Sequence, residues 1–265
     1  MPKYTVKDLF DLKGKKQLTE VLVTSPEEAM ACEIAGIDML ITGGGNTEQA
    51  TAIREAAPNT FLTLGIGYGS VSSATEAVRA GFEFLRIGAD AVYIAGSMEF
   101  IKAMSQEGIP VVGHVGLIPS KSTWTGGFKA VGKTADEALK VYQHTVAHQE
   151  AGAIGVEMEV VPHQIAAEIT KRVDLIVISM GSGSDCDAQY LFAMDILKSH
   201  TGHIPRHAKV YRNFVAEYER LQQERIAAFQ EYQADVESGA FPGKGNIVEA
   251  DEAELEKFTK ALDQA

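Results

Sequence analysis

The sequence predicts an α/β protein of the (β/α)8 class, a TIM barrel with additional C-terminal helices. Short apolar runs of strand length alternate with helical patterns along most of the chain. The 265 residues suit one such barrel, which needs about 250. Two small domains would also fit this length, but no Pro/Gly/Ser-rich linker or long charge run divides the chain.

Continuous apolar runs of this length are typical of parallel strands that are covered on both faces. We expect eight of them, the last being the weakest, and eight βα units close a barrel. An open, doubly wound sheet is the alternative arrangement. The predicted strands are Glu20–Thr24, Met39–Thr42, Thr60–Leu64, Ala91–Ile94, Val111–Val115, Ile154–Val161, Leu175–Ser179 and Tyr190–Met194.

Helical patterns fill the intervals between these strands. Pro26 after Ser25 fits the first helical position behind an N-cap. The predicted helices are Pro26–Ala35, Thr47–Ala56, Ser73–Arg86, Met98–Gln106, Ala135–Ala151 and His163–Arg172. We expect a single domain in 1–265, with the barrel at about 17–200 and a helical extension at about 206–265. That extension comprises the amphipathic stretch Arg206–Val236 and a short helix within Glu249–Leu262.

Composition excludes several classes of function. The net charge is −12, from 24 basic and 36 acidic residues, whereas a nucleic-acid surface needs a basic patch. The charge gives no support for binding to an anionic membrane either. Cys32 and Cys186 do not suggest a disulfide framework or a zinc site, which favours a reducing compartment. The N-terminus lacks an apolar signal core and no apolar run reaches 18 residues, so we expect a cytoplasmic protein.

In a barrel of this class the chemistry occurs at the C-terminal ends of the strands. Glu157 and Glu159 alternate on one predicted strand, so both side chains point the same way. We expect them at the mouth of the lumen, because carboxylates facing the helix layer would be buried without partners. A carboxylate there suits proton transfer next to a carbonyl, and a structural ion pair is the alternative. His114 ends the strand before and is a candidate to orient a substrate oxygen, or else a hydrogen-bonded core histidine.

Glycine-rich loops follow two other strands. The backbone N–H groups of Gly43, Gly44 and Gly45, and of Gly181, Ser182 and Gly183, are candidates to bind the charged end of a substrate. Tight turns are the alternative explanation for both loops. Cys186 lies near the second loop but has no catalytic partner close in sequence.

The segment from Gly108 to Gly243 resembles ketopantoate hydroxymethyltransferase (3-methyl-2-oxobutanoate hydroxymethyltransferase). The matching pieces stand in the family's order and at about its spacing. They are IPVVGHVGLIPS, GGFKAVGKT, EMEVVP followed by QIAAEIT, GSG followed by DAQ, GHIPRHAK and DVESGAFPG. Upstream, AGIDMLITG, APNTFLTLG and AGADAVYIAG follow the same frame more weakly.

The resemblance implies a (β/α)8 barrel of the phosphoenolpyruvate mutase/isocitrate lyase superfamily. It also implies transfer of a hydroxymethyl group from methylenetetrahydrofolate to 3-methyl-2-oxobutanoate, with Mg²⁺ stabilising the enolate of the 2-oxo acid. The family's catalytic base falls on Glu159, and its substrate-contacting histidine falls on His114. Large homo-oligomers are a further implication of the resemblance.

The positions of the family's metal ligands depart from this pattern. Its two metal-ligand aspartates fall on Gly44 and Gly65, and the serine after the first falls on Gly45. Its lysine and glutamate on the fourth strand fall on Tyr93 and Ala95, which makes Tyr93 a possible site residue. Because Mg²⁺ prefers oxygen ligands that include carboxylates, we predict no metal at this position.

Two interpretations of the site follow. The chemistry either needs no metal, with glycine N–H groups holding the substrate's charge, or uses a metal bound through Glu157, Glu159 and His114. The expected activity makes or breaks a carbon–carbon bond next to the carbonyl of a small 2-oxo acid, through an enolate. A metal-independent lyase, aldolase or decarboxylase and a non-catalytic barrel that binds a carboxylate ligand are the alternatives.

Overall fold

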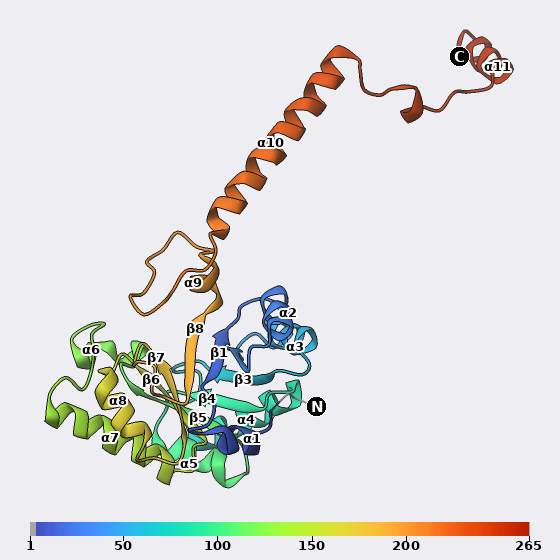
Figure 1. The fold of residues 1–265 in the computed structure, drawn as a ribbon. Helices are drawn as coiled ribbons and strands as arrows, with labels where there is room; N and C mark the ends of the chain where they lie inside the picture. Colours follow the sequence, from blue (N-terminus) through green and yellow to red (C-terminus); the bar gives the residue numbers. More distant parts are fainter. Residues whose placement is uncertain (1–3, 265) are drawn as a thin grey trace. The chain divides into compact units, whose positions relative to one another are not determined.

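The computed structural model describes residues 4–264 and contains a closed barrel of eight parallel strands in the order β1 to β8. The predicted fold class is therefore confirmed, and the open sheet is excluded (Figure 1). The strands are β1 (Leu18–Leu22), β2 (Met39–Gly43), β3 (Phe61–Ile66), β4 (Ala91–Ile94), β5 (Val111–Gly116), β6 (Gly155–Glu159), β7 (Ile176–Met180) and β8 (Ala188–Phe192).

Helices begin where the sequence supplies caps. Ser25, Asn46, Ser73 and Ser97 accept hydrogen bonds from backbone N–H groups in the first turns of α2 to α5. Thr134 and Glu137 form a capping box at α7. The helices of the barrel are α1 (Val6–Leu12), α2 (Pro26–Ala35), α3 (Thr47–Ala56), α4 (Ala74–Ile87), α5 (Met98–Gln106), α6 (Ser122–Thr125), α7 (Ala135–Glu150), α8 (His163–Thr170) and α9 (Ala193–Leu197).

Several elements differ from the sequence prediction at their ends. β1 begins and ends two residues before the predicted Glu20–Thr24, and β6 and α8 each end two residues before the predicted Val161 and Arg172. β8 begins at Ala188, two residues before the predicted strand, and the short segment 181–187 joins it to β7 without a helix. The long C-terminal helix α10 (Phe214–Ser238) begins eight residues later than Arg206. Asn213 caps this helix, and its side chain accepts a hydrogen bond from the N–H of Ala216.

Alternation along the strands sorts side chains between the lumen and the helix layer. Val156 and Met158 on β6 pack outwards in a cluster with Ala166 and Ile169 of α8. The lumen cluster consists of the residues that alternate with these outward-facing ones along each strand. Leu9 of α1 joins this cluster and closes the N-terminal end of the barrel. Its other buried members are Leu18, Met39, Ile41, Phe61, Ala91, Val112, Ile176, Ile178, Met180, Ala188 and Tyr190.

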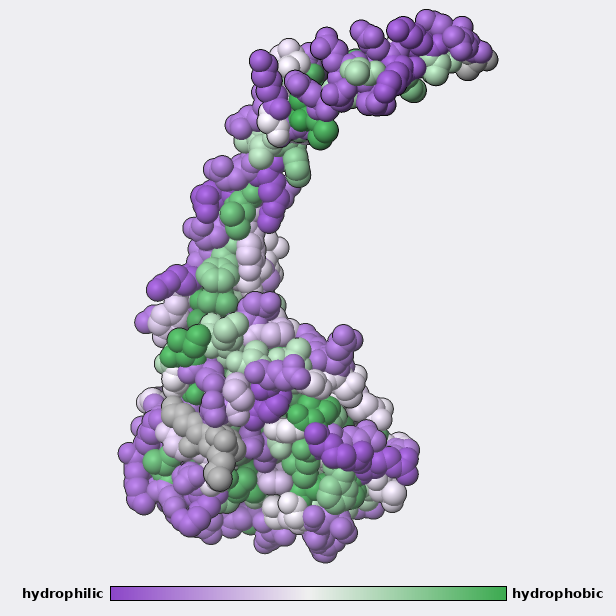
Figure 2. All heavy atoms as spheres, turned by 90° about the vertical axis from the view of Figure 1, so that its right-hand side faces the viewer, coloured by the Kyte–Doolittle hydropathy of each residue, from purple (hydrophilic) through white to green (hydrophobic). Residues whose placement is uncertain are grey.

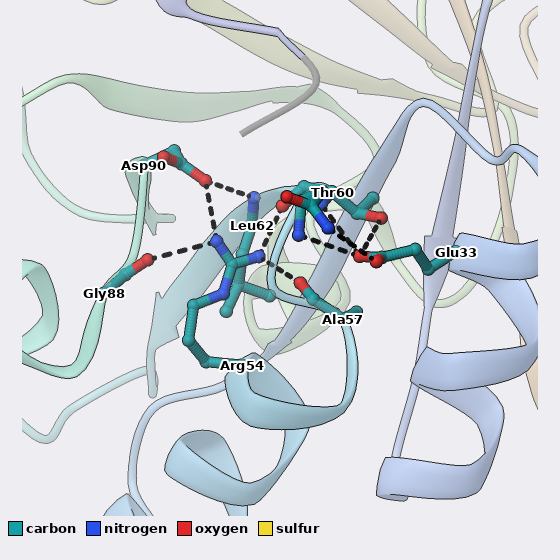
Figure 3. Close-up of polar contacts among 8 residues, drawn as sticks. Glu33, Arg54, Ala57, Thr60, Leu62, Gly88 and Asp90 are labelled. Carbon is teal, nitrogen blue, oxygen red and sulfur yellow. Dashed lines mark hydrogen bonds and ion pairs between the residues drawn. The ribbon is translucent and has the colours of Figure 1, made fainter. Parts of the chain in front are cut away.

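A polar network at the N-terminal ends of β3 and β4 holds α3 against the barrel (Figure 3). Arg54 of α3 forms an ion pair with Asp90 at 3.3 Å and donates to the carbonyl oxygens of Ala57 and Thr60. Asp90 also accepts from the N–H of Leu62 at 2.8 Å. Glu33 of α2 accepts from the N–H and hydroxyl of Thr60. These contacts lie on the face of the barrel opposite the expected chemistry, where polar networks serve stability.

The chain divides into two compact units between Arg212 and Asn213. The second unit contains α10 and α11 (Glu252–Leu262), and its surface mingles apolar with polar side chains (Figure 2). Its exposed large apolar residues include Tyr218, Leu221, Ile226, Phe229, Tyr232, Val236, Leu255, Phe258 and Leu262. Within the described residues, no helix is both long and apolar enough to span a bilayer.

Candidate active site

The barrel register brings four titratable side chains together in the lumen. Tyr93 on β4 pairs with Val112 on β5, and His114 on β5 pairs with Glu157 on β6. Glu159 follows two residues later and therefore faces the same way as Glu157. Both carboxyls point into the lumen, as the sequence predicted, and both are buried.

His114 lies between two groups of oxygen atoms. Its Nδ1 is 2.8 Å from the hydroxyl of Tyr93 and 3.3 Å from a carboxylate oxygen of Glu157. Its Nε2 is 2.7 Å from the carbonyl oxygen of Leu117 and 3.3 Å from a carboxylate oxygen of Glu159. The structure therefore unites the predicted residues His114, Glu157, Glu159 and Tyr93 in one cluster.

This arrangement favours the imidazolium form of His114. Burial lowers the pKa of His114, but hydrogen bonds and charge attraction from Glu157 and Glu159 together outweigh burial and raise it to about 9. Both ring nitrogens then carry hydrogen, and the hydrogen on Nε2 is also required by the carbonyl of Leu117, because a carbonyl can only accept. Nδ1–H donates towards the oxygen of Tyr93, which leaves the phenol hydrogen free for another acceptor.

Burial also sets the protonation of the neighbours of His114. Burial raises the pKa of Tyr93, and the charges of Glu157 and Glu159 add to this, so Tyr93 remains a neutral phenol. Burial raises the pKa of the Glu157 carboxyl, while the attraction of His114 opposes the shift. One oxygen of Glu157, Oε1, is buried without a hydrogen-bond partner among the described residues.

The glycines of the GHVG motif shape β5 around this histidine. A Cβ at Gly113 would lie 2.0 Å from the ring of His148, which packs behind the strand. Gly116 has φ of 84° and a Cβ there would lie 2.3 Å from the carbonyl oxygen of Glu159. Gly116 therefore permits the bend that turns the carbonyl of Leu117 back towards His114.

The chain is strained immediately after the predicted base. Val160 has φ of 49°, an unfavourable conformation for a β-branched residue, which costs about 1–3 kcal/mol. Its N–H donates to the carbonyl of Met180 at 2.9 Å, and its carbonyl accepts from Val131 at 3.1 Å. The neighbouring strand and loop thus fix the backbone that carries Glu159.

A further acid lies in the lumen that the sequence analysis did not single out. Glu20 on β1 is 2% exposed and pairs in register with Met39 and Tyr190. Burial, with the charge of Glu157, raises the pKa of Glu20 well above its ordinary value. A glutamate inside the apolar run EVLVT was the signal that could have revealed it.

A cleft of about 350 Å³ opens at the C-terminal ends of β3 and β4, the end of the barrel that also carries the cluster. Lys121, from the loop after β5, is its one charged lining residue among those described, and its ammonium lies 5.9 Å from the ring of Tyr68. The remaining lining residues are Ile66, Gly67, Gly69, Val71, Ile94, Ala95, Gly96, Ser97 and Phe100. The sequence analysis did not identify Lys121, because one lysine in a loop carries no distinctive signal.

The two predicted glycine loops lie at the same end of the barrel but outside this cluster. The N–H of Gly44 donates to the carbonyl of Gly65 at 2.9 Å, while Gly43 and Gly45 are exposed. In the second loop Ser182 is buried. Its hydroxyl donates to Met158 and accepts from Val161, and its N–H donates to Ser179. A role for either loop in binding a substrate stays a prediction.

His163 and His207 pack against the second loop, and Cys186 lies close to it in sequence. A Cβ at Gly183 would lie 2.3 Å from His163, and a Cβ at Gly181 would lie 2.9 Å from the ring of His207. Cys186 is buried, and burial raises the pKa of its thiol, which disfavours the nucleophilic thiolate.

The two positions that correspond to the family's metal-ligand aspartates, Gly44 and Gly65, do not fit a metal site. A Cβ at Gly44 would lie 2.0 Å from Cζ of Phe84, so this ring fills the space of a ligand side chain. The ring of Tyr93 lies 3.4 Å from the Cβ position of Gly65. Across the described residues, no three His, Cys, Asp or Glu side chains are arranged to bind an ion.

The cluster can therefore supply acid–base chemistry from its own side chains. Glu159 offers a carboxylate at the mouth, Tyr93 offers a phenol hydrogen, and the imidazolium of His114 offers a fixed positive charge. A buried positive charge near a developing oxyanion stabilises it more strongly than the same charge in water. These are the requirements for removing a proton next to a carbonyl group.

Solved structures with the same architecture define the class of barrel. A 2,3-dimethylmalate lyase of the PEP mutase/isocitrate lyase superfamily superimposes with a TM-score of 0.53 at 14% identity, covering 100% of this chain and 99% of its own. Phosphonopyruvate hydrolase, solved with oxalate and magnesium, gives 0.54 at 12% identity, with coverage of 100% and 99%. The chain thus shares the barrel fold of these two proteins.

Sequence similarity places the chain more narrowly. The sequence model of the ketopantoate hydroxymethyltransferase family matches residues 45–244. The chain is 31% identical to the 3-methyl-2-oxobutanoate hydroxymethyltransferase of Nitrosopumilus maritimus, over 97% of this chain and 98% of that protein. It is 33% identical to the enzyme of that name from Thermus thermophilus, over 91% and 97%. The chain belongs to the ketopantoate hydroxymethyltransferase family, a family of enzymes, as its motifs predicted.

Proposed function

We propose that this protein makes or breaks the carbon–carbon bond next to the carbonyl of a small 2-oxo acid, through an enolate, with hydroxymethyl transfer to 3-methyl-2-oxobutanoate as the leading reaction. The observation that carries the proposal is the imidazolium of His114 held between Glu157 and Glu159 at the barrel mouth. The two relatives are named for hydroxymethyl transfer to that acid.

In the proposed reaction the 2-oxo acid lies over the cluster with its carbonyl oxygen at Tyr93. The phenol donates a hydrogen bond to this oxygen, and the imidazolium behind it stabilises the negative charge that develops there. Glu159 takes the proton from the carbon next to the carbonyl, and the C–H electron pair becomes the enolate. The enolate carbon then bonds to the carbon of a formaldehyde-level C=O unit, which water releases from its nitrogen carrier where it arrives as C=N. The π pair of the C=O bond moves to its oxygen, which takes back the proton from Glu159 and becomes the hydroxyl of the new hydroxymethyl group.

The substrate's carboxylate is proposed to lie in the cleft at β3 and β4. Lys121 supplies the positive charge there, and Gly67 and Gly69 leave room beside the backbone. Since the ring of Phe84 occupies the family's first metal-ligand position and glycine stands at the second, the proposed mechanism contains no metal-dependent step. This favours a metal-independent reaction, whether transfer or a lyase-type cleavage.

The test is exchange of the C3 proton of 3-methyl-2-oxobutanoate in deuterated water, followed by proton NMR, with EDTA or with Mg²⁺. We expect exchange in both, and its loss in Glu159→Gln by at least about 100-fold. Glu168→Gln, an exposed glutamate of α8, is the matched control and should exchange like the wild type. Exchange that needs Mg²⁺ would overturn the metal-independent mechanism, and unchanged exchange in Glu159→Gln would overturn the assignment of the base. No exchange with this acid, pyruvate or oxaloacetate would overturn the proposed activity.

We propose a cytoplasmic homo-oligomer that does not bind nucleic acid or membranes. Both cysteines are free thiols, which suits a reducing compartment, and the net charge of −12 opposes polyanions. The exposed apolar side chains of α10, among them Leu221 and Phe229, support association. Sedimentation at several concentrations should give a mass above 28.5 kDa, and Phe229→Glu should lower it. A monomeric wild type would contradict oligomer formation.

A further inference from the structure

Glu20 is the one buried carboxyl of the lumen that the proposed reaction leaves unused. It projects from β1 below the cluster, and its Oε2 has no hydrogen-bond partner among the described residues. A carboxylate buried without partners is far more costly than a neutral carboxylic acid. Burial without a partner therefore favours the neutral, protonated form of Glu20.

Among the described residues, the surroundings of Glu20 offer no positive charge that is not already paired. The titratable groups that face the lumen with it are Tyr93 on β4, His114 on β5, Glu157 and Glu159 on β6, and Tyr190 on β8. The other facing groups, on β2, β3, β7 and α1, are uncharged: Met39, Phe61, Thr63, Ile176, Ile178 and Leu9. The only cation of this set, His114, is already paired with Glu157 and Glu159.

A small cavity beside Glu20 allows its hydrogen to be accommodated. About 10 Å³ is open there to the centre of a water molecule, with Glu20 and Thr63 as the side chains that carry polar atoms. This is about the space of one water, which buried polar groups commonly hold. A water here would accept from the carboxylic acid and exchange its proton with solvent.

We infer that Glu20 is a positioning residue that must remain uncharged for an anionic 2-oxo acid to bind above it, an inference that rests on the proposed function. An ionised Glu20 would add a second uncompensated charge beside Glu157 in a medium of low dielectric. The lumen would then repel the substrate's carboxylate and oppose the enolate. Ionisation of Glu20 at high pH thus weakens substrate binding, although Glu20 does not touch the substrate.

The first experiment asks whether Glu20 is protonated. Infrared difference spectra of wild type, Glu20→Gln and Glu55→Gln are compared at neutral pH, where Glu55 is an exposed glutamate of α3. The C=O stretch of a protonated carboxylic acid should be present in wild type and Glu55→Gln and weaker in Glu20→Gln. Equal bands in all three proteins would overturn the inference. Glu20→Met gives the same test should Glu20→Gln fold poorly.

The second experiment measures binding of oxalate, a planar dianion like the enolate of a 2-oxo acid, from about pH 6 to 10 by calorimetry. For each group that must be protonated for oxalate to bind, the Kd rises about tenfold per pH unit above the pKa of that group. We expect the limiting slope of wild type and Glu55→Gln to exceed that of Glu20→Gln by about one proton. Equal slopes would overturn the inference alone, whereas no oxalate binding to any variant would overturn the proposed anion site as well.

Discussion

Replacement of Gly44 by alanine tests whether Phe84 has closed the family's metal position. The added Cβ would lie 2.0 Å from Cζ of Phe84, 2.4 Å from Cε2 and 2.5 Å from Cε1. Carbon atoms in contact lie about 3.5–4 Å apart, so the ring or the strand end must move by about 1.5 Å. Phe84 is only 7% exposed, within the apolar cluster between strands and helices, so it has little room to move.

We expect Gly44→Ala to lower the free energy of unfolding by about 1–3 kcal/mol, the usual cost of an overpacked core. Gly45→Ala is the matched control, because nothing lies within 4 Å of its Cβ position and its φ is not positive. It should remain within about 0.5 kcal/mol of wild type. Urea denaturation with a constant m value measures both changes.

A double-mutant cycle assigns the cost to Phe84. Phe84→Leu shortens the side chain, so the loss caused by Gly44→Ala should be smaller in that background than in wild type. Gly44→Ala as stable as Gly45→Ala, or an equal loss with and without Phe84→Leu, would refute the reasoning. The same geometry predicts that Gly44→Asp combined with Gly65→Asp gains no Mg²⁺ binding in calorimetry, and tight binding by a stable double variant would contradict it.

Three further changes probe the lumen and the stabilising face. Glu20→Met should raise the free energy of unfolding by about 1–3 kcal/mol near neutral pH, because it removes a buried, unpartnered polar group. Since the pKa of Glu20 is raised in the folded state, Glu20 lowers the free energy of unfolding more and more as pH rises above about 4.5. The stability gained by Glu20→Met in thermal unfolding should therefore increase with pH. A gain that stays constant with pH would contradict this account. The folded pKa of His114, about 9, lies above its unfolded value of about 6.5, so its stabilisation is complete below pH 6.5 and lost as pH approaches 9. The stability deficit of His114→Gln in urea should therefore shrink over that interval, and a constant deficit would show that the charge of His114 contributes little. Arg54→Met leaves Asp90 without its cation and should cost about 2–4 kcal/mol, with no change in the activity of the folded enzyme; a loss below about 0.5 kcal/mol in urea would contradict the role of the network.

The sequence alone determined the elements and much of the chemistry. Apolar runs and caps are local properties, so α2, α3 and α5 were predicted with their observed bounds. Alternation along a strand is also local, and it placed Glu157 and Glu159 on one face before the barrel was known. The motif GHVG and its companions fixed the family. The first and eighth strands and the start of α10 were displaced, because the register between neighbouring strands and the contacts of distant segments decide where these elements begin.

Only the tertiary structure decided how these residues work together. The partners of the two nitrogens of His114 come from β4, β6 and the bend after Gly116, and a strand's neighbours follow from barrel closure and not from its own sequence. The ring of Phe84 in the space beside Gly44 and the position of Glu20 in the lumen are likewise contacts between distant segments. Sequence supplies the chemical groups and the face on which each one lies, whereas distance, burial and charge are set when the chain packs.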